Sequence, residues 1–310
     1  LAEDGAIFIS IDDNEHANLL LVCNEIFGSN NFIQDIIWNK RVSPARDAKF
    51  FSTDHEYILV YSKNKESLTT HFLPRTEKNN SYYKNPDNDP RGPWNSAAYT
   101  CNKSRDERPN LYYPITNPYT GEKIFPKESA VWAYSEETYQ QHVRDNLLYW
   151  GVNGEAKQPR KKAFLSEVGD VVPRSVWSHS DVGSTQKATM ENNTIFNMRA
   201  FSYPKVSTLV ERIIQIASDK DSIVLDSFAG SGTTAHAVLN MNKSDGGNRK
   251  FILVEMGDYA DTITAERVKR VINGYGEGKN AVEGTGGNFS YYELGNPLFM
   301  QDGTINDEVD

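Results

Sequence analysis

The sequence predicts an α/β protein that is interrupted by an irregular α+β insertion. Residues 1–63 and 199–292 combine short apolar runs, typical of buried strands, with apolar stripes at helical spacing. Residues 64–198 have weak periodicity and are rich in Pro, Asn, Tyr and turn pairs such as Asn85-Pro86. We therefore divide the chain into two α/β parts, the insertion between them and a tail, residues 293–310.

The composition is that of a soluble globular protein. The chain has 310 residues and a net charge of −9, and none of its apolar runs approaches the roughly 18–20 residues of a membrane span. The acidic balance argues against a purely electrostatic DNA or membrane binder but is compatible with a local basic face. Cys23 and Cys101 are too few for a Cys-rich zinc site and do not suggest a disulfide framework, so we expect a reducing, cytoplasmic compartment. The first residues carry no signal-peptide pattern. The sequence begins with Leu1 rather than Met, just before a strand, so we expect a fragment.

The first α/β part predicts one helix and three strands. Asp12 and Glu15 match the capping-box pattern at the start of a helix, and Gly28 follows its apolar stripe. The strands are expected over three apolar runs, residues 6–11, 32–38 and 57–61.

The second α/β part contains a strand, a glycine-rich turn and a helix in succession. Residues 223–226 are expected as a buried strand, residues 227–232 as the turn and residues 233–242 as the helix. In α/β proteins such a turn holds a nucleotide-like ligand at the carboxyl end of the sheet. The neighbouring helices and strand are expected at residues 205–218, 251–254 and 262–272.

The glycine turn and two acidic residues indicate which ligand this site binds. Residues 230–235 fit G-x-G-x-x-A, which alone also fits a nicotinamide-dependent oxidoreductase. Asp226 ends the first strand, where a carboxylate attracts a ligand ammonium and repels a pyrophosphate. Glu255 ends the next strand, where a carboxylate accepts hydrogen bonds from two ribose hydroxyls. These residues favour S-adenosylmethionine over a dinucleotide. In the alternative interpretation, the two carboxylates only cap loops.

Three basic stretches are candidates for contact with double-stranded DNA. They are the loop of residues 39–54, a pair of a cation and an aromatic residue at residues 91–94, and a cluster at residues 157–162. Such groups neutralise phosphates or stack on bases. The alternative for each stretch is a solvated charged surface. The candidate residues are Arg41, Arg91, Trp94, Arg160, Lys161 and Lys162.

Four segments resemble one family of DNA-modifying enzymes. Asp226 to Thr234, Asp-Ser-Phe-Ala-Gly-Ser-Gly-Thr-Thr, resembles the cofactor motif of β-class amino-group DNA methyltransferases. Gly5 to Glu15 resembles the segment after the catalytic motif in the modification (Mod) subunits of Type III restriction-modification systems. Tyr203-Pro204-Lys205 resembles the Lys-Pro element before the cofactor strand, although Val206 stands where Pro is usual. The end of the insertion, residues 162–173, resembles the end of a target-recognition domain.

The resemblance covers almost the whole chain and implies a fold, a cofactor and a reaction. It implies a circularly permuted, Rossmann-like methyltransferase sheet, with its N-terminal part missing here and residues 64–198 as the target-recognition domain. It implies transfer of the methyl group of S-adenosylmethionine to adenine N6 in double-stranded DNA, without a metal. The implied protein partners are a second Mod subunit in a homodimer and a restriction (Res) helicase-nuclease subunit. The implied cofactor-binding residues are Asp226, Phe228, Ala229, Gly230, Gly232, Thr233, Glu255 and Lys205.

The family's motif for presenting the target base, Asp-Pro-Pro-Tyr, does not occur in the 310 residues. The nearest match, Asn117-Pro118-Tyr119, precedes Thr120-Gly121 and is interpreted as a turn. The resemblance places the motif before Leu1, so we expect little or no methyltransferase activity from this polypeptide alone. The alternatives are a solitary β-class methyltransferase for adenine N6 or cytosine N4, a non-catalytic DNA-recognition or dimerisation fragment, and the nicotinamide-dependent oxidoreductase.

Overall fold

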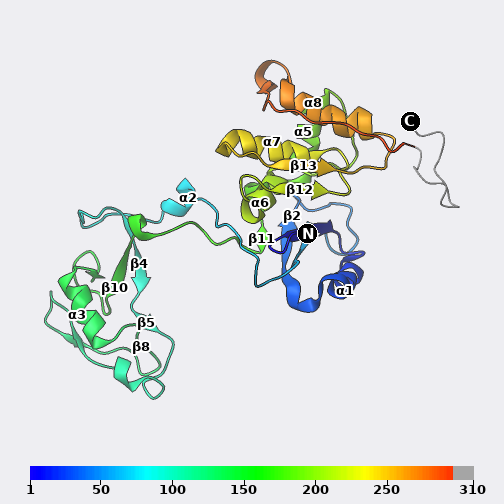
Figure 1. Cartoon of the computed structure of the whole chain (residues 1–310). Helices are drawn as coiled ribbons and strands as arrows, with labels where there is room; N and C mark the ends of the chain where they lie inside the picture. Colours follow the sequence, from blue (N-terminus) through cyan, green and yellow to red (C-terminus); the bar gives the residue numbers. More distant parts are fainter. Residues whose placement is uncertain (296–310) are drawn as a thin grey trace. The chain divides into compact units, whose positions relative to one another are not determined.

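The computed structural model describes residues 1–295, which form two compact units (Figure 1). Of the described residues, one unit contains residues 1–72 and 173–295, and the other contains residues 73–172. The predicted insertion, residues 64–198, is wider than this second unit, because residues 64–72 and 173–198 cluster with the α/β unit. The predicted tail lies outside the described residues from residue 296 on.

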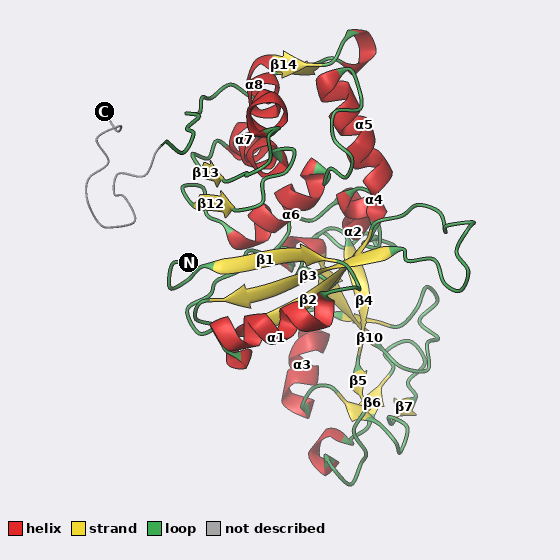
Figure 2. Ribbon diagram, turned by 90° about the vertical axis from the view of Figure 1, so that its right-hand side faces the viewer, coloured by secondary structure: helices red, strands yellow, loops and turns green. Residues whose placement is uncertain are grey.

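The N-terminal part of the α/β unit is a four-stranded sheet with one helix on its face (Figure 2). The helix α1 (His16–Phe27) packs Cys23 against Leu59 and Tyr61 of the sheet. The second strand in the spatial order runs antiparallel to both of its neighbours, and the last two strands are parallel. The predicted strands are confirmed, with small shifts at their ends. In spatial order the strands are β1 (Ala6–Ile11), β3 (His55–Ser62), β2 (Phe32–Asn39) and β11 (Val176–Trp177).

The capping box predicted for Asp12 and Glu15 is wrong. Glu15 is itself the N-cap residue of α1, and no side chain caps this end of the helix. Asp12 instead accepts hydrogen bonds from the backbone and side-chain nitrogens of Asn14, both at 3.0 Å, which makes a local turn. The helix ends at Gly28, as expected, with a φ of +81° that favours glycine.

The C-terminal part of the α/β unit is a two-stranded parallel sheet packed against helices. Strand β12 (Ile223–Asp226) pairs with β13 (Lys250–Leu253). Helices α6 (Ser207–Ala217) and α7 (Thr233–Asp245) cover one face of this sheet, and α7 also packs on α8 (Glu266–Asn273). The predicted last helix begins as a π-helical turn, Ala260–Ala265, that continues into α8. The remaining elements are α4 (His179–Val182), α5 (Thr185–Phe196), β14 (Gly274–Tyr275) and β15 (Val282–Glu283).

The expectation that residues 223–226 are buried is wrong for half of the strand. Val224 packs into the core beneath α6 and α7. Ile223 and Leu225, which point to the opposite face, are 64% and 63% exposed. A continuous apolar run predicts a strand that is covered on both faces, whereas the described residues leave much of this second face uncovered.

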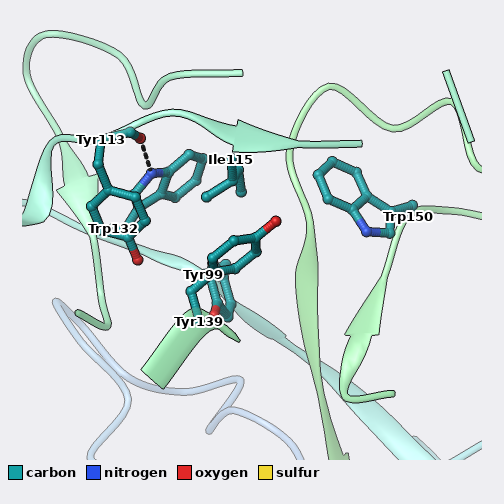
Figure 3. Close-up of a cluster of buried hydrophobic side chains, with 6 residues drawn as sticks. All are labelled: Tyr99, Tyr113, Ile115, Trp132, Tyr139 and Trp150. Carbon is teal, nitrogen blue, oxygen red and sulfur yellow. Dashed lines mark hydrogen bonds between the residues drawn. The ribbon is translucent and has the colours of Figure 1, made fainter. Parts of the chain in front are cut away.

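The inserted unit, residues 73–172, consists of short strands and two helices around an aromatic core (Figure 3). In this core Trp132 Nε1 donates a hydrogen bond to the carbonyl of Tyr113 at 2.7 Å, so the buried indole is satisfied. The irregular α+β character expected here is confirmed. The core residues are Tyr99, Tyr113, Ile115, Trp132, Tyr139 and Trp150. The sheets are β4 (Trp94–Ala98) with β10 (Arg160–Phe164) and β9 (Leu148–Tyr149), β5 (Thr100–Cys101) with β8 (Val131–Trp132), and β6 (Ile115–Thr116) with β7 (Lys123–Ile124). The helices are α2 (Glu77–Asn80) and α3 (Glu136–Arg144).

Candidate functional site

The turn between β12 and α7 is a closely held backbone loop. Ala229 N donates to the carbonyl of Val254 at 3.1 Å, and Gly232 N donates to the carbonyl of Ala229 at 2.8 Å. Gly230 and Gly232 have φ values of +53° and +79°, which favour glycine. A Cβ at Gly232 would lie 2.9 Å from the carbonyl oxygen of Thr264. The turn therefore needs glycine at this position for its backbone angles and for its space.

Asp226 directs its carboxylate into the turn. Its Oδ1 accepts a hydrogen bond from Phe228 N at 3.1 Å, and its Oδ2 accepts one from Thr234 Oγ1 at 2.5 Å. An ionised carboxylate has about four lone-pair sites, so acceptor capacity remains for a ligand ammonium. The Phe228 ring is exposed beside it.

Glu255 joins the second strand to the glycine turn. Its carboxylate accepts hydrogen bonds from Gly230 N at 2.7 Å and from Gly257 N at 2.9 Å. Burial raises the pKa of Glu255, but the N–H groups of Gly257 and Gly230 outweigh it and hold that pKa below its usual value. The ionised carboxylate keeps lone pairs that fit ribose hydroxyls, so the residues present suit a ligand with an ammonium and a ribose.

Arg267 supports the turn from the interior, and the sequence analysis did not identify it. This fully buried side chain on α8 donates from Nη1 to Ser231 Oγ and to Thr233 Oγ1, both at 2.9 Å. Its Nη2 lies 3.0 Å from Glu191 Oε2 on α5 and 3.0 Å from His236 Nδ1. Burial and the charge of Arg267 lower the pKa of His236 well below its usual value, so the neutral imidazole accepts this hydrogen bond.

Two aromatic residues beside the turn were also missed. A Cβ at Gly230 would lie 3.5 Å from the ring of Phe201, so that ring closes one side of the turn. Tyr259 packs on Phe201 edge to face, with ring centroids 5.4 Å apart. Both residues are in segments without periodicity, where the sequence carries no signal for their position.

Lys205 contacts the turn with its backbone and not with its ammonium. Its carbonyl accepts a hydrogen bond from Thr233 Oγ1 at 3.2 Å. Its Nζ pairs with Glu56, which also binds Lys40 Nζ at 2.9 Å. Burial raises the pKa of Glu56, but Lys205 and Lys40 together hold that pKa below its usual value. The ammonium also lies 5.2 Å from the centre of the Trp38 ring. The side chain of Lys205 is therefore engaged away from the turn, contrary to the expectation that it binds the cofactor.

Three of the predicted DNA-contacting residues are engaged in contacts within the inserted unit, where Trp94 and Lys162 are buried and Arg91 remains partly exposed. Lys162 is 2% exposed and pairs with Asp87 at 2.5 Å and with Asp89 at 2.8 Å. Trp94 is 4% exposed and donates to Asp87 at 2.9 Å. Arg91 binds Asp89 at 2.7 Å and stacks over Phe164 at 4.4 Å. Trp94 and Lys162 offer no surface for DNA, and most donors of Arg91 are occupied. The expectation therefore does not fit these positions.

The other predicted DNA-contacting residues lie nearer to solvent. Arg160 is exposed and donates from Nε to Ser96 Oγ at 2.9 Å. Lys161 is half-buried, with its ammonium 5.2 Å from the centre of the Tyr134 ring. Arg41 is exposed in the loop between β2 and β3.

The segment around Asn117 is a turn, as interpreted from the sequence. Gly121 N donates to the carbonyl of Asn117 at 2.9 Å, and Tyr119 N donates to the side-chain oxygen of Asn117 at 2.8 Å.

Within residues 1–295 no group of three His, Cys, Asp or Glu side chains could hold a metal ion. No helix in the same residues has the length and apolarity to cross a membrane.

Comparison with known families places this site in context. Residues 1–266 match the N6_N4_Mtase model, described as DNA methylase, and the chain therefore belongs to this family. A relative named Type III restriction-modification enzyme StyLTI Mod subunit, from Salmonella typhimurium, is 35% identical over 286 residues. The aligned region covers 87% of this chain and 42% of that protein.

Two further proteins are similar to this chain. Type II methyltransferase M.KpnI from Klebsiella pneumoniae is 33% identical, over 82% of this chain and 63% of that protein. The structure of the PvuII DNA methyltransferase, a cytosine-N4-specific enzyme, has a TM-score of 0.42 and 13% identity, over 86% of this chain and 64% of that one. The chain thus spans less than two thirds of the length of these proteins.

Proposed function

We propose that this chain binds S-adenosylmethionine at the turn of residues 227–232 and belongs to an enzyme that methylates adenine N6 in double-stranded DNA. Membership of the DNA methylase family supports the reaction class. The similarity to a Type III Mod subunit supports assignment of the chain to the modification subunit of a Type III restriction-modification system. On this proposal the enzyme is cytoplasmic, forms a Mod homodimer and supplies DNA specificity to a Res subunit.

The observation that carries the choice of cofactor is the hydrogen bond from Gly230 N to Glu255. A dinucleotide site needs the N–H groups of its glycine turn for the pyrophosphate. Here the Glu255 carboxylate accepts the hydrogen bond from Gly230 N, and the Asp226 carboxylate accepts the one from Phe228 N. These two N–H groups are therefore not free for a pyrophosphate. Two carboxylates at the turn repel a pyrophosphate and attract the ammonium of S-adenosylmethionine. This arrangement argues against the oxidoreductase alternative.

We assign the roles at the site by position. Asp226 takes the amino-acid ammonium, Glu255 takes the ribose hydroxyls, and the backbone of residues 228–233 lies along the ligand between them. Phe228 is the exposed apolar side chain beside this path. Lys205 positions the turn through its carbonyl. When bound, S-adenosylmethionine supplies an electrophilic methyl group for direct transfer to nitrogen.

We assign target recognition to the inserted unit, with Arg160 and Lys161 as its DNA-contacting candidates. Both residues lie on β10, where Arg160 is exposed and Lys161 is half-buried, whereas Lys162 on the same strand is buried. Arg41 in the α/β unit is the third candidate. Each would neutralise a backbone phosphate, which positions DNA without reading its sequence.

The test combines cofactor binding with analysis of the product. Calorimetry should show that the chain binds S-adenosylmethionine and does not bind NAD. Binding of NAD without binding of S-adenosylmethionine would contradict the assignment of the cofactor. Radiolabelled methyl transfer to duplex DNA, followed by nucleoside digestion, separates N6-methyladenine from N4-methylcytosine. Because the 310 residues contain no Asp-Pro-Pro-Tyr, cofactor binding is the readout that does not depend on turnover.

A solitary methyltransferase is the second candidate, because M.KpnI is a Type II enzyme of similar identity. The cofactor residues would be the same in both cases. A neighbouring gene for an ATP-dependent restriction subunit, and co-purification of its product, would favour the Type III assignment.

A further inference from the structure

The loop between β2 and β3, residues 40–54, presents two adjacent phenylalanine side chains to solvent. Phe50 is 81% exposed and Phe51 is 92% exposed. Burial of such rings is worth about 2–3 kcal/mol each, so their exposure is a cost that packing within the described residues does not offset. Two neighbouring exposed aromatic rings on one loop indicate a contact surface.

The charges around these rings are mostly positive. Arg41, Arg46 and Lys49 are exposed, and the Lys49 ammonium lies 5.2 Å from the centre of the Phe50 ring. The loop has one exposed carboxylate, Asp47. In a chain of net charge −9, this loop is therefore a local basic surface with aromatic rings in its middle.

The base of the loop is fixed by hydrogen bonds. Lys40 N donates to the carbonyl of Asp54 at 2.8 Å, and Thr185 N donates to the carbonyl of Lys40 at 3.0 Å. Farther along the loop, Ala45 N donates to Ser52 Oγ at 2.7 Å, and that hydroxyl donates to Asp54 at 2.5 Å. The two phenylalanines are therefore held on an anchored loop.

The base of the loop is connected to the cofactor turn by a short series of contacts. Lys40 binds Glu56, Glu56 binds Lys205, and the carbonyl of Lys205 accepts the hydrogen bond from Thr233. The base of the loop and the first residue of α7 are thus linked through Glu56 and Lys205 within the same unit.

We propose that residues 41–53 form a DNA-contacting loop, in which Phe50 and Phe51 stack on bases exposed by extrusion of the target base and the cations bind the flanking phosphates. This inference rests on the proposed function, because an enzyme that modifies the amino group of a base in duplex DNA must take that base out of the stack. Aromatic rings stack on bases of any identity, and cations beside them neutralise phosphates. DNA has phosphates beside every base, so cations next to two exposed rings match a DNA strand, and association with a second copy of this chain is an outcome that the test distinguishes.

The experiment measures binding of the 310-residue chain to two fluorescent duplexes, one intact and one with a single abasic position. The abasic duplex has an opening in its stack, so the unmodified chain should bind it more tightly. The pair Phe50→Ala with Phe51→Ala should lower affinity for the abasic duplex by about 5-fold or more, because stacking is worth about 1–3 kcal/mol per base. It should leave affinity for the intact duplex within about 2-fold, since phosphate contacts dominate there.

A second pair of substitutions tests the charges. Arg46→Ala with Lys49→Ala should weaken binding to both duplexes equally and reduce the salt slope of log K by about 2, because each phosphate contact contributes about 0.9. Two matched controls in the same unit, Phe72→Ala and Lys250→Ala, remove an exposed ring and an exposed cation elsewhere and should change neither quantity.

The leucine pair Phe50→Leu with Phe51→Leu separates stacking from general apolar contact. It should behave as the alanine pair if the rings stack on bases. If it behaves as the unmodified chain, or if the alanine pair only converts a dimer to a monomer in sedimentation, the loop is an apolar protein contact and the inference fails. Unchanged preference for the abasic duplex in the alanine pair also overturns it. Failure of the unmodified chain to bind either duplex would instead overturn the proposed DNA substrate together with the loop.

Discussion

Arg267 Nη1 lies 2.9 Å from Thr233 Oγ1, so a buried cation holds the first residue of α7 from beneath the glycine turn. The same guanidinium binds Ser231 in the turn and Glu191 on α5. The turn is therefore held by a side chain that is fully buried. The position of the turn depends on how α8 and α5 pack.

Replacement of Arg267 by Met should destabilise the fold and weaken cofactor binding. It leaves the Glu191 carboxylate and the hydroxyls of Ser231 and Thr233 without their buried partner. Loss of one member of a buried ion pair costs about 3–5 kcal/mol in the free energy of unfolding. Urea unfolding measures this change. Lys269→Met on the same helix removes a half-exposed cation and should cost less than about 1 kcal/mol. Equal unfolding midpoints for both variants would contradict the support role of Arg267.

Replacement of Gly232 by Ala should reduce affinity for S-adenosylmethionine by about 10-fold or more, which corresponds to about 1.4 kcal/mol. The φ of +79° disfavours alanine, and its Cβ would meet the carbonyl oxygen of Thr264 at 2.9 Å. The turn must therefore shift. Calorimetry measures the affinity.

Gly246, at the other end of α7, offers the matched control. Its φ is +68°, but an added Cβ meets nothing within 4 Å. Gly246→Ala should therefore lower stability through backbone strain and leave cofactor affinity unchanged. Equal affinity losses in the two variants would show that global strain, and not the shape of the turn, controls binding.

The sequence was sufficient to locate the strand, the glycine turn and the helix that follows it, because the signals for these elements are local. The glycines lie between a strand and a helix, directly after Asp226, and Glu255 follows the next strand along the chain. Part of the signal for Arg267 was also present, because it shares one helical face with Thr264, Val268 and Val271. Its partner Glu191 is 76 residues away, and no local pattern connects them.

The sequence was less informative about the basic cluster at residues 160–162. Arg160 and Lys162 are similar residues on one strand, yet only Lys162 is buried. The difference comes from Asp89, which is 73 residues earlier and binds the ammonium of Lys162. A tertiary contact of this length cannot be inferred from charge patterns, and the same holds for the burial of Trp94.

Glu255 should make stability and cofactor affinity depend on pH in the acidic range. Its pKa is lowered from 4.5 in the folded chain. Its contribution to stability is therefore fully present above pH 4.5 and is lost as the pH falls through the lowered folded value. The free energy of unfolding of the unmodified chain minus that of Glu255→Gln should be constant above pH about 5 and should shrink below it.

The control for this pH profile is Glu277→Gln, which changes an exposed carboxylate in the same unit. The free energy of unfolding of this variant should depend on pH in the same way as that of the unmodified chain. If Glu255→Gln also retains full affinity for S-adenosylmethionine at pH 7, the role of Glu255 toward the ribose is wrong, whatever its effect on stability.

Lys162 and Lys161 should separate the stability of the inserted unit from its proposed contact with DNA. Arg91 and Lys162 hold the pKa of Asp89 well below its usual value although that carboxylate is buried. Lys162→Met leaves Asp89 without one of its two cations, so it should cost about 3–5 kcal/mol in the free energy of unfolding. Lys161→Met should cost less than about 1 kcal/mol and should reduce the salt slope of DNA binding by about 1. Calorimetric unfolding and binding titrations at several salt concentrations measure both effects. A Lys162→Met variant of normal stability with a reduced salt slope would place Lys162 at the DNA and contradict its burial.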